Sequence, residues 1–239
     1  MVRITFVTLR KGRENVRIKW LGQSGYILDD GNTKICIDPY LSDIVNKVAG
    51  RPRIRPVPVM PEELDADIVI CTHNHLDHID IEAIPKMKKE NIKFFAPSDC
   101  REALLDLGVK NFVPFDEGTE IQAGKFKLKA VFADHTVTAI GVVIEYEGEK
   151  LYFSGDTYYN EKLEGIECDY MFICINGKLG NMNVEEAIAL TKKISPAIAV
   201  PNHYDMFESN SEDPMRFDVP QRFIMEFNKE YEVKDKCLI

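Results

Sequence analysis

The sequence predicts one α/β (α+β) domain, residues 1–239, in which two β-sheets pack together and are flanked by helices. Three observations support this fold class. Short apolar runs broken by turn residues fill the first quarter of the chain, and strand and helix patterns alternate later. The longest apolar runs, such as 139–144 (AIGVVI), have only the length of a strand. A chain of 239 residues buries enough surface to fold without disulfides.

The first quarter is expected to form antiparallel strands at 16–21, 24–28 and 33–37. Asp30-Gly31-Asn32 predicts a hairpin turn, because these residue types tolerate a positive φ. Residues 40–63 then lose all periodicity. The stretch 50–64 (GRPRIRPVPVMPEEL) contains four prolines, which exclude a regular helix or a central strand. Structureless segments of this length are usually functional or disordered.

The later elements follow from the same signals. In chain order they are a strand at 66–71, a helix at 98–107, paired strands at 125–132 and 139–146, strands at 150–153 and 170–175, a helix from Asn183 to Pro196, a strand at 197–200 and a helix at 218–228. Ser98 is expected to cap the first helix and Gly108 to end it. Asn183 and Glu186 have the spacing of a capping box.

Composition restricts the function. With 30 Lys+Arg against 39 Asp+Glu the net charge is −9, which argues against nucleic acid as a partner. No apolar run has the length of a membrane span, and the N-terminus lacks a signal-peptide pattern. We therefore expect a cytoplasmic protein without a membrane partner that acts on a small molecule, and an oligomer is compatible with the sequence. Cys36, Cys71 and Cys174 lie in strand-like runs and are interpreted as buried hydrophobic residues, not disulfide partners.

Chemistry concentrates directly after the predicted strand 66–71. Three histidines and an aspartate occupy six positions: His73, His75, Asp77 and His78. Loops that leave the carboxyl ends of strands commonly carry active sites. Imidazole and carboxylate are ligands that Zn²⁺, Mn²⁺ and Fe²⁺ accept. A polar surface loop is the alternative, but the chain has only five histidines and three of them lie here.

The remaining histidines also follow predicted strands. His135 comes after the strand 125–132, and His203 follows the strand 197–200. Asp156, in Ser154-Gly155-Asp156-Thr157, comes directly after the strand 150–153. Alone it indicates an ordinary turn, but beside these histidines its two oxygens suit a bridge between two cations.

These residues together resemble the metallo-β-lactamase superfamily. The motif HxHxDH is followed by His135, Asp156 and His203 at intervals of 57, 21 and 47 residues. Within the superfamily, the stretches THNHLDHID, SGDTYYN and PNHYDMFESNSEDP are most similar to the ascorbate-6-phosphate lactonase-like branch. The resemblance implies a four-layer αββα sandwich. It also implies one or two divalent ions, Zn²⁺ by the superfamily or Mn²⁺ by the lactonase branch.

The resemblance also assigns roles to individual residues. His73, His75 and His135 would hold the first metal, while Asp77, His78 and His203 would hold the second. Asp156 would bridge the two metals. Asp38, in Ile37-Asp38-Pro39, would orient a ligand by hydrogen bonding and would not touch the metal.

The implied reaction is hydrolysis by a metal-bound hydroxide, most simply of a small sugar-derived lactone, either with or without a phosphate group. Asp156 and Asp77 are the catalytic candidates. Asp77 would orient the nucleophile or receive its proton, or would serve only as a ligand. A metallo-phosphodiesterase is the alternative enzyme. A di-iron redox enzyme would resemble HxExD, whereas this chain has His75 at the second position. A non-catalytic metal-binding module would not need all seven ligands.

Substrate contacts are predicted from position alone. Arg51 and Arg53, with Arg55, lie in the proline-rich segment, where guanidinium groups can clamp a phosphate or carboxylate. Tyr158 and Tyr159 follow SGDT, and Tyr204 follows His203. The alternative for each is a solvated or packed side chain.

Overall fold

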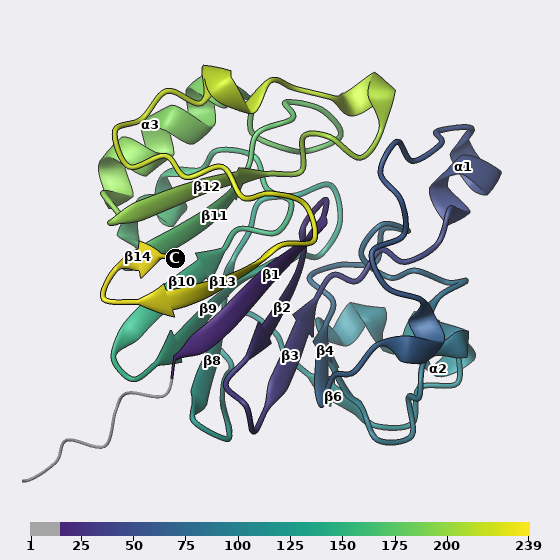
Figure 1. The fold of residues 1–239 in the computed structure, drawn as a ribbon. Helices are drawn as coiled ribbons and strands as arrows, with labels where there is room; N and C mark the ends of the chain where they lie inside the picture. Colours follow the sequence, from purple (N-terminus) through teal and green to yellow (C-terminus); the bar gives the residue numbers. More distant parts are fainter. Residues whose placement is uncertain (1–14) are drawn as a thin grey trace, which may run out of the picture.

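The computed structural model describes residues 15–239, which form two sheets packed face to face (Figure 1). The first sheet has the strand order β14-β13-β1-β2-β3-β4-β5-β6. Its strands are β1 (Val16–Gly22), β2 (Gly25–Asp29), β3 (Lys34–Ile37), β4 (Ile68–Ile70), β5 (Lys93–Ala96), β6 (Phe112–Pro114), β13 (Glu230–Lys234) and β14 (Cys237–Leu238). The second sheet has the order β12-β11-β10-β9-β8-β7. Its strands are β7 (Glu120–Ala123), β8 (Phe126–Phe132), β9 (Ile140–Tyr146), β10 (Glu149–Phe153), β11 (Tyr170–Cys174) and β12 (Ile198–Asn202).

Within residues 15–239, three α-helices accompany the sheets: α1 (Ile44–Ala49), α2 (Arg101–Asp106) and α3 (Val184–Ile194). The start of α3 has the predicted capping box. The Asn183 side chain accepts from the Glu186 N–H at 2.9 Å, and the Glu186 carboxylate accepts from the Asn183 N–H at 3.0 Å. The helix ends at Ser195, whose φ of +55° is left-handed, and Pro196 prevents its continuation.

The apolar cores define four layers, which confirms the predicted fold class. Between the sheets, Tyr26 of β2 contacts Phe153 and Phe172 of the second sheet, with ring centroids 5.1 and 5.0 Å apart. The helix α3 packs on the outer face of the second sheet, where Thr191 reaches the Met171 sulfur at 3.7 Å. A second buried cluster, which includes Val69 and Leu104, lies under α2 on the outer face of the first sheet.

The helix predicted at 218–228 is wrong. The segment has turns at 220–221 and 227–228, and between them it lies beside β12, where the Ala199 N–H donates to the Gln221 carbonyl and the Phe223 N–H donates to the Ala199 carbonyl. The strand β12 is the last of its sheet, so its outer backbone groups need partners, and this segment supplies them. Pro220 also disfavours a continuous helix.

Other differences are local. The six-residue helix α1 lies within the region predicted to lack regular structure, and it has no side-chain cap that could have signalled it. Ser98 does not cap α2, because its hydroxyl and N–H both donate to the Asp116 carboxylate. The strands β5, β6, β7, β13 and β14 were not predicted. All six cysteines are free, and Cys36, Cys71 and Cys174 are fully buried.

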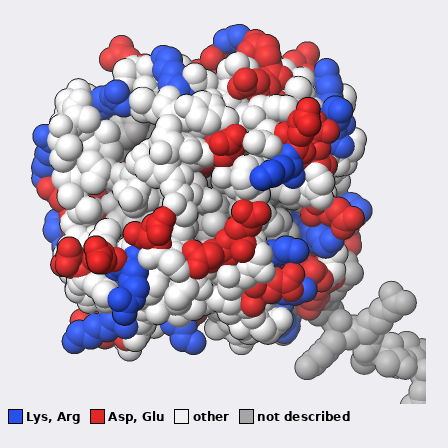
Figure 2. Space-filling model, turned by 180° about the vertical axis from the view of Figure 1, so that it is seen from behind, with Lys and Arg blue, Asp and Glu red and all other residues white. Residues whose placement is uncertain are grey.

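The surface is mixed in charge. Figure 2, seen from behind, shows acidic and basic side chains distributed among uncharged ones on that face, without a continuous basic patch. Among residues 15–239, none of the helices has the length and apolar character needed to cross a membrane.

Candidate metal centre

The site lies where loops from both sheets meet at one edge of the sandwich. The loop after β4 carries four of the predicted ligands, and the loops after β8, β10 and β12 carry one each. The structure brings all seven side chains together in three overlapping groups, and within each group the ligand atoms lie within 4.8 Å of one another. The residues are His73, His75, Asp77, His78, His135, Asp156 and His203.

The first group is made of three imidazoles. The Nδ1 atom of His75 lies 3.0 Å from His73 Nε2 and 3.2 Å from His135 Nε2. Burial lowers the pKa of all three side chains, so they are neutral at pH 7 and each offers a lone pair. Neutral ring nitrogens that converge on one point fit a cation.

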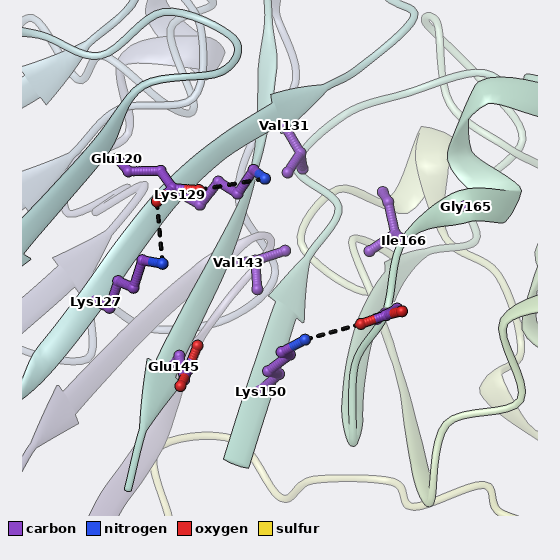
Figure 3. Close-up of a pocket in the computed structure, with 10 residues that line it drawn as sticks. Glu120, Lys127, Lys129, Val131, Val143, Glu145, Lys150, Gly165 and Ile166 are labelled. Carbon is purple, nitrogen blue, oxygen red and sulfur yellow. Dashed lines mark hydrogen bonds and ion pairs between the residues drawn. The ribbon is translucent and has the colours of Figure 1, made fainter. Parts of the chain in front are cut away.

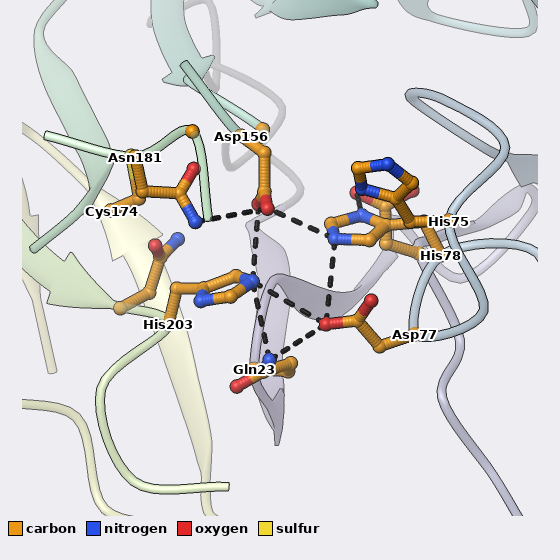
Figure 4. Close-up of polar contacts among 12 residues, drawn as sticks. Gln23, His75, Asp77, His78, Asp156, Cys174, Asn181 and His203 are labelled. Atoms are coloured by element: carbon orange, nitrogen blue, oxygen red, sulfur yellow. Dashed lines mark hydrogen bonds and ion pairs between the residues drawn. The ribbon is translucent and has the colours of Figure 1, made fainter. Parts of the chain in front are cut away.

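The second group, which contains Asp77, His78 and His203, lies beside Asp156 and combines acids and bases (Figure 4). Asp156 Oδ1 lies 3.3 Å from His78 Nε2 and 3.2 Å from His203 Nε2. Asp77 Oδ2 lies 3.8 and 3.5 Å from the same two nitrogens. Although these contacts have ion-pair distances, His78 Nε2 and Asp156 Oδ1 are buried without a hydrogen-bond partner. Atoms that converge without bonding one another fit ligands of a shared divalent ion.

The charge state of the second group differs from that of the first. Burial alone would lower the pKa of His78, but Asp38, Asp156 and Asp77 outweigh it and raise this pKa well above its usual value. Burial also opposes protonation of His203, yet Asp156 and Asp77 raise its pKa to about 9. Despite burial, the two imidazolium groups lower the pKa of Asp77 and Asp156. The carboxylates therefore favour protons on the His78 and His203 rings.

The third group, His73, His78 and Asp156, shares members with the other two. The Asp156 carboxylate thus lies close to members of both of these groups. Asn181 fixes its second oxygen, because Asn181 Nδ2 donates to Asp156 Oδ2 at 3.0 Å.

Asp38 lies behind His78, fully buried, at the place expected for an orienting carboxylate. Its Oδ2 lies 2.8 Å from His78 Nδ1 and accepts the Thr72 hydroxyl at 2.8 Å. Its Oδ1 accepts the Thr72 N–H, also at 2.8 Å. These contacts fix the ring of His78 so that Nε2 faces the cluster.

Three supporting residues were not identified from the sequence. Asn181 holds Asp156, and the Gly180 carbonyl lies 3.0 Å from His135 Nδ1. Gln23 donates to Asp77 at 2.8 Å. The only signal was glycine nearby: Gly22 and Gly25 flank Gln23, and the loop INGKLG precedes Asn181. Glycines next to polar residues after strands mark tight turns, which can direct side chains inward.

Two arginines of the predicted clamp, Arg53 and Arg55, have partners within the protein. The Arg53 guanidinium donates to the main-chain carbonyls of Tyr40, Ser42, Arg55 and Pro56. Arg55 pairs with Asp205. Both side chains therefore hold the proline-rich segment in place, and a clamp on a substrate stays a prediction. Arg51 is half-buried.

The three tyrosines predicted to contact a substrate have different surroundings. Tyr204 is buried against Trp20, with ring centroids 5.5 Å apart, and packs as a core residue. The Tyr159 hydroxyl donates to Glu164. Tyr158 alone has an exposed side chain, at 44%.

A separate hollow of about 320 Å³ lies on the outer face of the second sheet, away from the histidines (Figure 3). Most of its charged side chains form ion pairs with one another. Glu120 pairs with Lys127 at 3.0 Å and Lys129 at 3.4 Å, and Lys150 pairs with Glu167 at 2.9 Å. This hollow offers no comparable set of ligand atoms.

Fold and site together define a metallohydrolase-type centre, and comparison with known proteins agrees. The family model described as a beta-lactamase superfamily domain matches residues 33–204. A UPF0173 metal-dependent hydrolase of Thermoplasma acidophilum is 32% identical over 216 residues, which cover 85% of this chain and 90% of that protein. The chain therefore belongs to the UPF0173 metal-dependent hydrolases of the metallo-β-lactamase superfamily.

Solved structures share the fold. A metallo hydrolase from the archaeon Ignicoccus hospitalis superposes with a TM-score of 0.75 at 22% identity, covering 92% of this chain and 99% of that one. An isothiocyanate hydrolase from Delia radicum gut bacteria gives a TM-score of 0.74 at 18% identity, covering 90% and 98%. The family model and the relative from Thermoplasma acidophilum confirm the superfamily resemblance. The lactonase-like branch is not distinguished by these matches and stays a prediction.

Proposed function

We propose that this protein uses one or two divalent ions, Zn²⁺ or Mn²⁺, to hydrolyse a small carbonyl substrate, with an uncharged lactone as the favoured class. The supporting observation is the convergence of seven histidine and aspartate side chains, with buried ligand atoms that no hydrogen bond satisfies. When bound, such ions polarise a scissile group and lower the pKa of water from about 15.7 toward about 7.

The residues of the site would have different roles. His73, His75 and His135 would hold one ion as neutral donors. Asp77, His78 and His203 would hold the other, with Asp156 between them; these two sets are called the first and second half-sites below. The Asp77 side chain is 16% exposed, against 4% for Asp156, so a substrate reaches Asp77 more easily. Its Oδ2 faces Gln23, His78 and His203, which leaves Oδ1 to accept a proton from the nucleophile (Figure 4).

The choice of a lactone rests on the similarity of THNHLDHID, SGDTYYN and PNHYDMFESNSEDP to the lactonase-like branch. A phosphorylated lactone is less favoured than the sequence suggested, because Arg53 and Arg55 already donate to carbonyls and to Asp205. The same consideration disfavours a phosphodiester. An isothiocyanate deserves testing, because a protein of the same fold is an isothiocyanate hydrolase.

The test is a metal-reconstituted activity screen. The protein is stripped with chelator, restored with Mn²⁺ or Zn²⁺, and assayed on lactones, phosphodiesters and isothiocyanates. We expect lactone turnover that His73→Ala reduces by more than about 100-fold, since loss of a ligand exceeds the roughly 10–100-fold effect typical of an outer partner. Turnover of another class alone would contradict the lactone. Failure of the wild type to take up metal would overturn the proposed function.

A further inference from the structure

Gln23 sits in the tight turn between β1 and β2, and its side chain enters the metal centre. The residue is only 2% exposed and has a left-handed φ of +53°. A non-glycine residue with positive φ is strained, and it persists only where its surroundings hold it. Figure 4 shows the Gln23 amide between Asp77 and His203.

The orientation of this amide follows from its neighbours. Its nitrogen lies 2.8 Å from Asp77 Oδ2 and 3.2 Å from His203 Nε2. An ionised carboxylate only accepts hydrogen bonds, so the NH₂ group, and not the oxygen, must face Asp77. Gln23 therefore fixes the oxygen of Asp77 that faces His78 and His203.

The main chain of Gln23 holds a second ligand. Its carbonyl accepts the His203 N–H at 3.2 Å and the Trp20 indole N–H at 2.9 Å. His203 itself has a φ of +58°, so its backbone also needs such support. One residue thus contacts two of the three ligands that form the second half-site.

The first half-site has other supports. The Gly180 carbonyl lies beside His135 Nδ1 at 3.0 Å, and the Thr72 hydroxyl lies 3.1 Å from His73 Nδ1. None of the hydrogen bonds described for Gln23 reaches His73, His75 or His135. Loss of the Gln23 amide should therefore act on one half-site and spare the other.

We propose that Gln23 is a positioning residue specific to the second half-site: its side-chain amide sets the Asp77 carboxylate and its carbonyl sets the His203 backbone. This inference rests on the proposed function, in which Asp77, His78 and His203 hold the second ion. The positioning residue lies 50 residues before the start of the HxHxDH motif, in the hairpin between β1 and β2.

The experiment measures the two ions separately in Gln23→Met, which keeps the length of the side chain and removes the donor. Metal-free protein is titrated with Co²⁺, followed by absorption and calorimetry, and the bound metal is counted after dialysis. We expect the first ion to bind as in the wild type and the second to bind about 10–100-fold more weakly. Gln122→Met is the matched control, because Gln122 is exposed on β7 and its side-chain amide donates to the Gly124 carbonyl, away from the ligands.

A second variant guards against misfolding. Gln23→Asn retains an amide but shortens its reach by one methylene, and asparagine tolerates positive φ well. It should fold and show the same selective loss. Unchanged binding of the second ion in both variants, or equal weakening of both ions, would overturn the inference while leaving the proposed function intact. A wild type that binds no Co²⁺ would instead overturn the proposed function, and this inference with it.

Discussion

At the scale of single residues, the two half-sites differ in what occupies their ligand atoms before metal arrives. His73, His75 and His135 are neutral, because burial lowers their pKa. His78 and His203 hold protons, since the neighbouring carboxylates raise their pKa despite burial. A divalent ion entering the second half-site must therefore displace protons, whereas one entering the first half-site need not.

This difference predicts the pH dependence of metal binding. The pKa of His203 is raised to about 9, so its proton competes with metal below that pH and ceases to compete above it. Affinity for the second ion should rise about tenfold per pH unit for each proton displaced between about pH 6.5 and 8.5. The first ion should respond weakly. Calorimetry in buffers of different ionisation enthalpy measures the protons released, and release of none on binding the second ion would contradict this assignment.

The same scale shows which residues could be predicted. Histidine is rare in this chain, and each one follows a strand, so sequence position alone indicated the cluster. Gln23 and Asn181 gave no such signal, because glutamine and asparagine are common in turns and their partners are distant in sequence. Gln23 meets Asp77 across 54 positions, and Asn181 meets Asp156 across 25. Only the tertiary fold brings these pairs together.

At the scale of elements, tertiary contacts determine the conformation of two segments whose structure could not be predicted from sequence periodicity. Arg222, in the segment 218–228, forms a bridge with Ala199 of β12, although the sequence of this segment suggested a helix. The proline-rich segment docks on the loop that follows His203, where the Ile54 N–H donates to the Met206 carbonyl at 2.8 Å and Arg55 pairs with Asp205. Capped helices and alternating strands were predictable because their signals are local.

The loop between β11 and α3 supports a prediction about the first half-site. Gly180 has a φ of +95°, and a Cβ there would lie 2.5 Å from His135 Nδ1. Gly180→Ala should therefore displace His135 and weaken the first ion by about 10–100-fold, measured by Co²⁺ titration. Gly165→Ala is the control, because its Cβ would meet nothing within 4 Å. Equal first-ion affinity in both variants would show that the loop tolerates the side chain.

At the scale of the whole molecule, the metal centre connects the two sheets. His73, His75, Asp77 and His78 follow β4 of the first sheet, whereas His135, Asp156 and His203 follow strands of the second. Each half-site takes ligands from both sheets: His135 completes the first, and His203 completes the second. A bound ion therefore links the layers directly, in addition to the apolar core between them.

This arrangement predicts that metal stabilises the entire fold. An ion that binds only the native state at 1,000 times its Kd adds about 4 kcal/mol to the free energy of unfolding. For a chain of this size, that corresponds to a rise in Tm of about 8–16 °C. Calorimetric melting with chelator and with Zn²⁺ or Mn²⁺ measures the shift. His73→Ala should lose much of it, because the first half-site then keeps only two imidazoles; an undiminished shift in this variant would mean that the stabilising ion binds elsewhere.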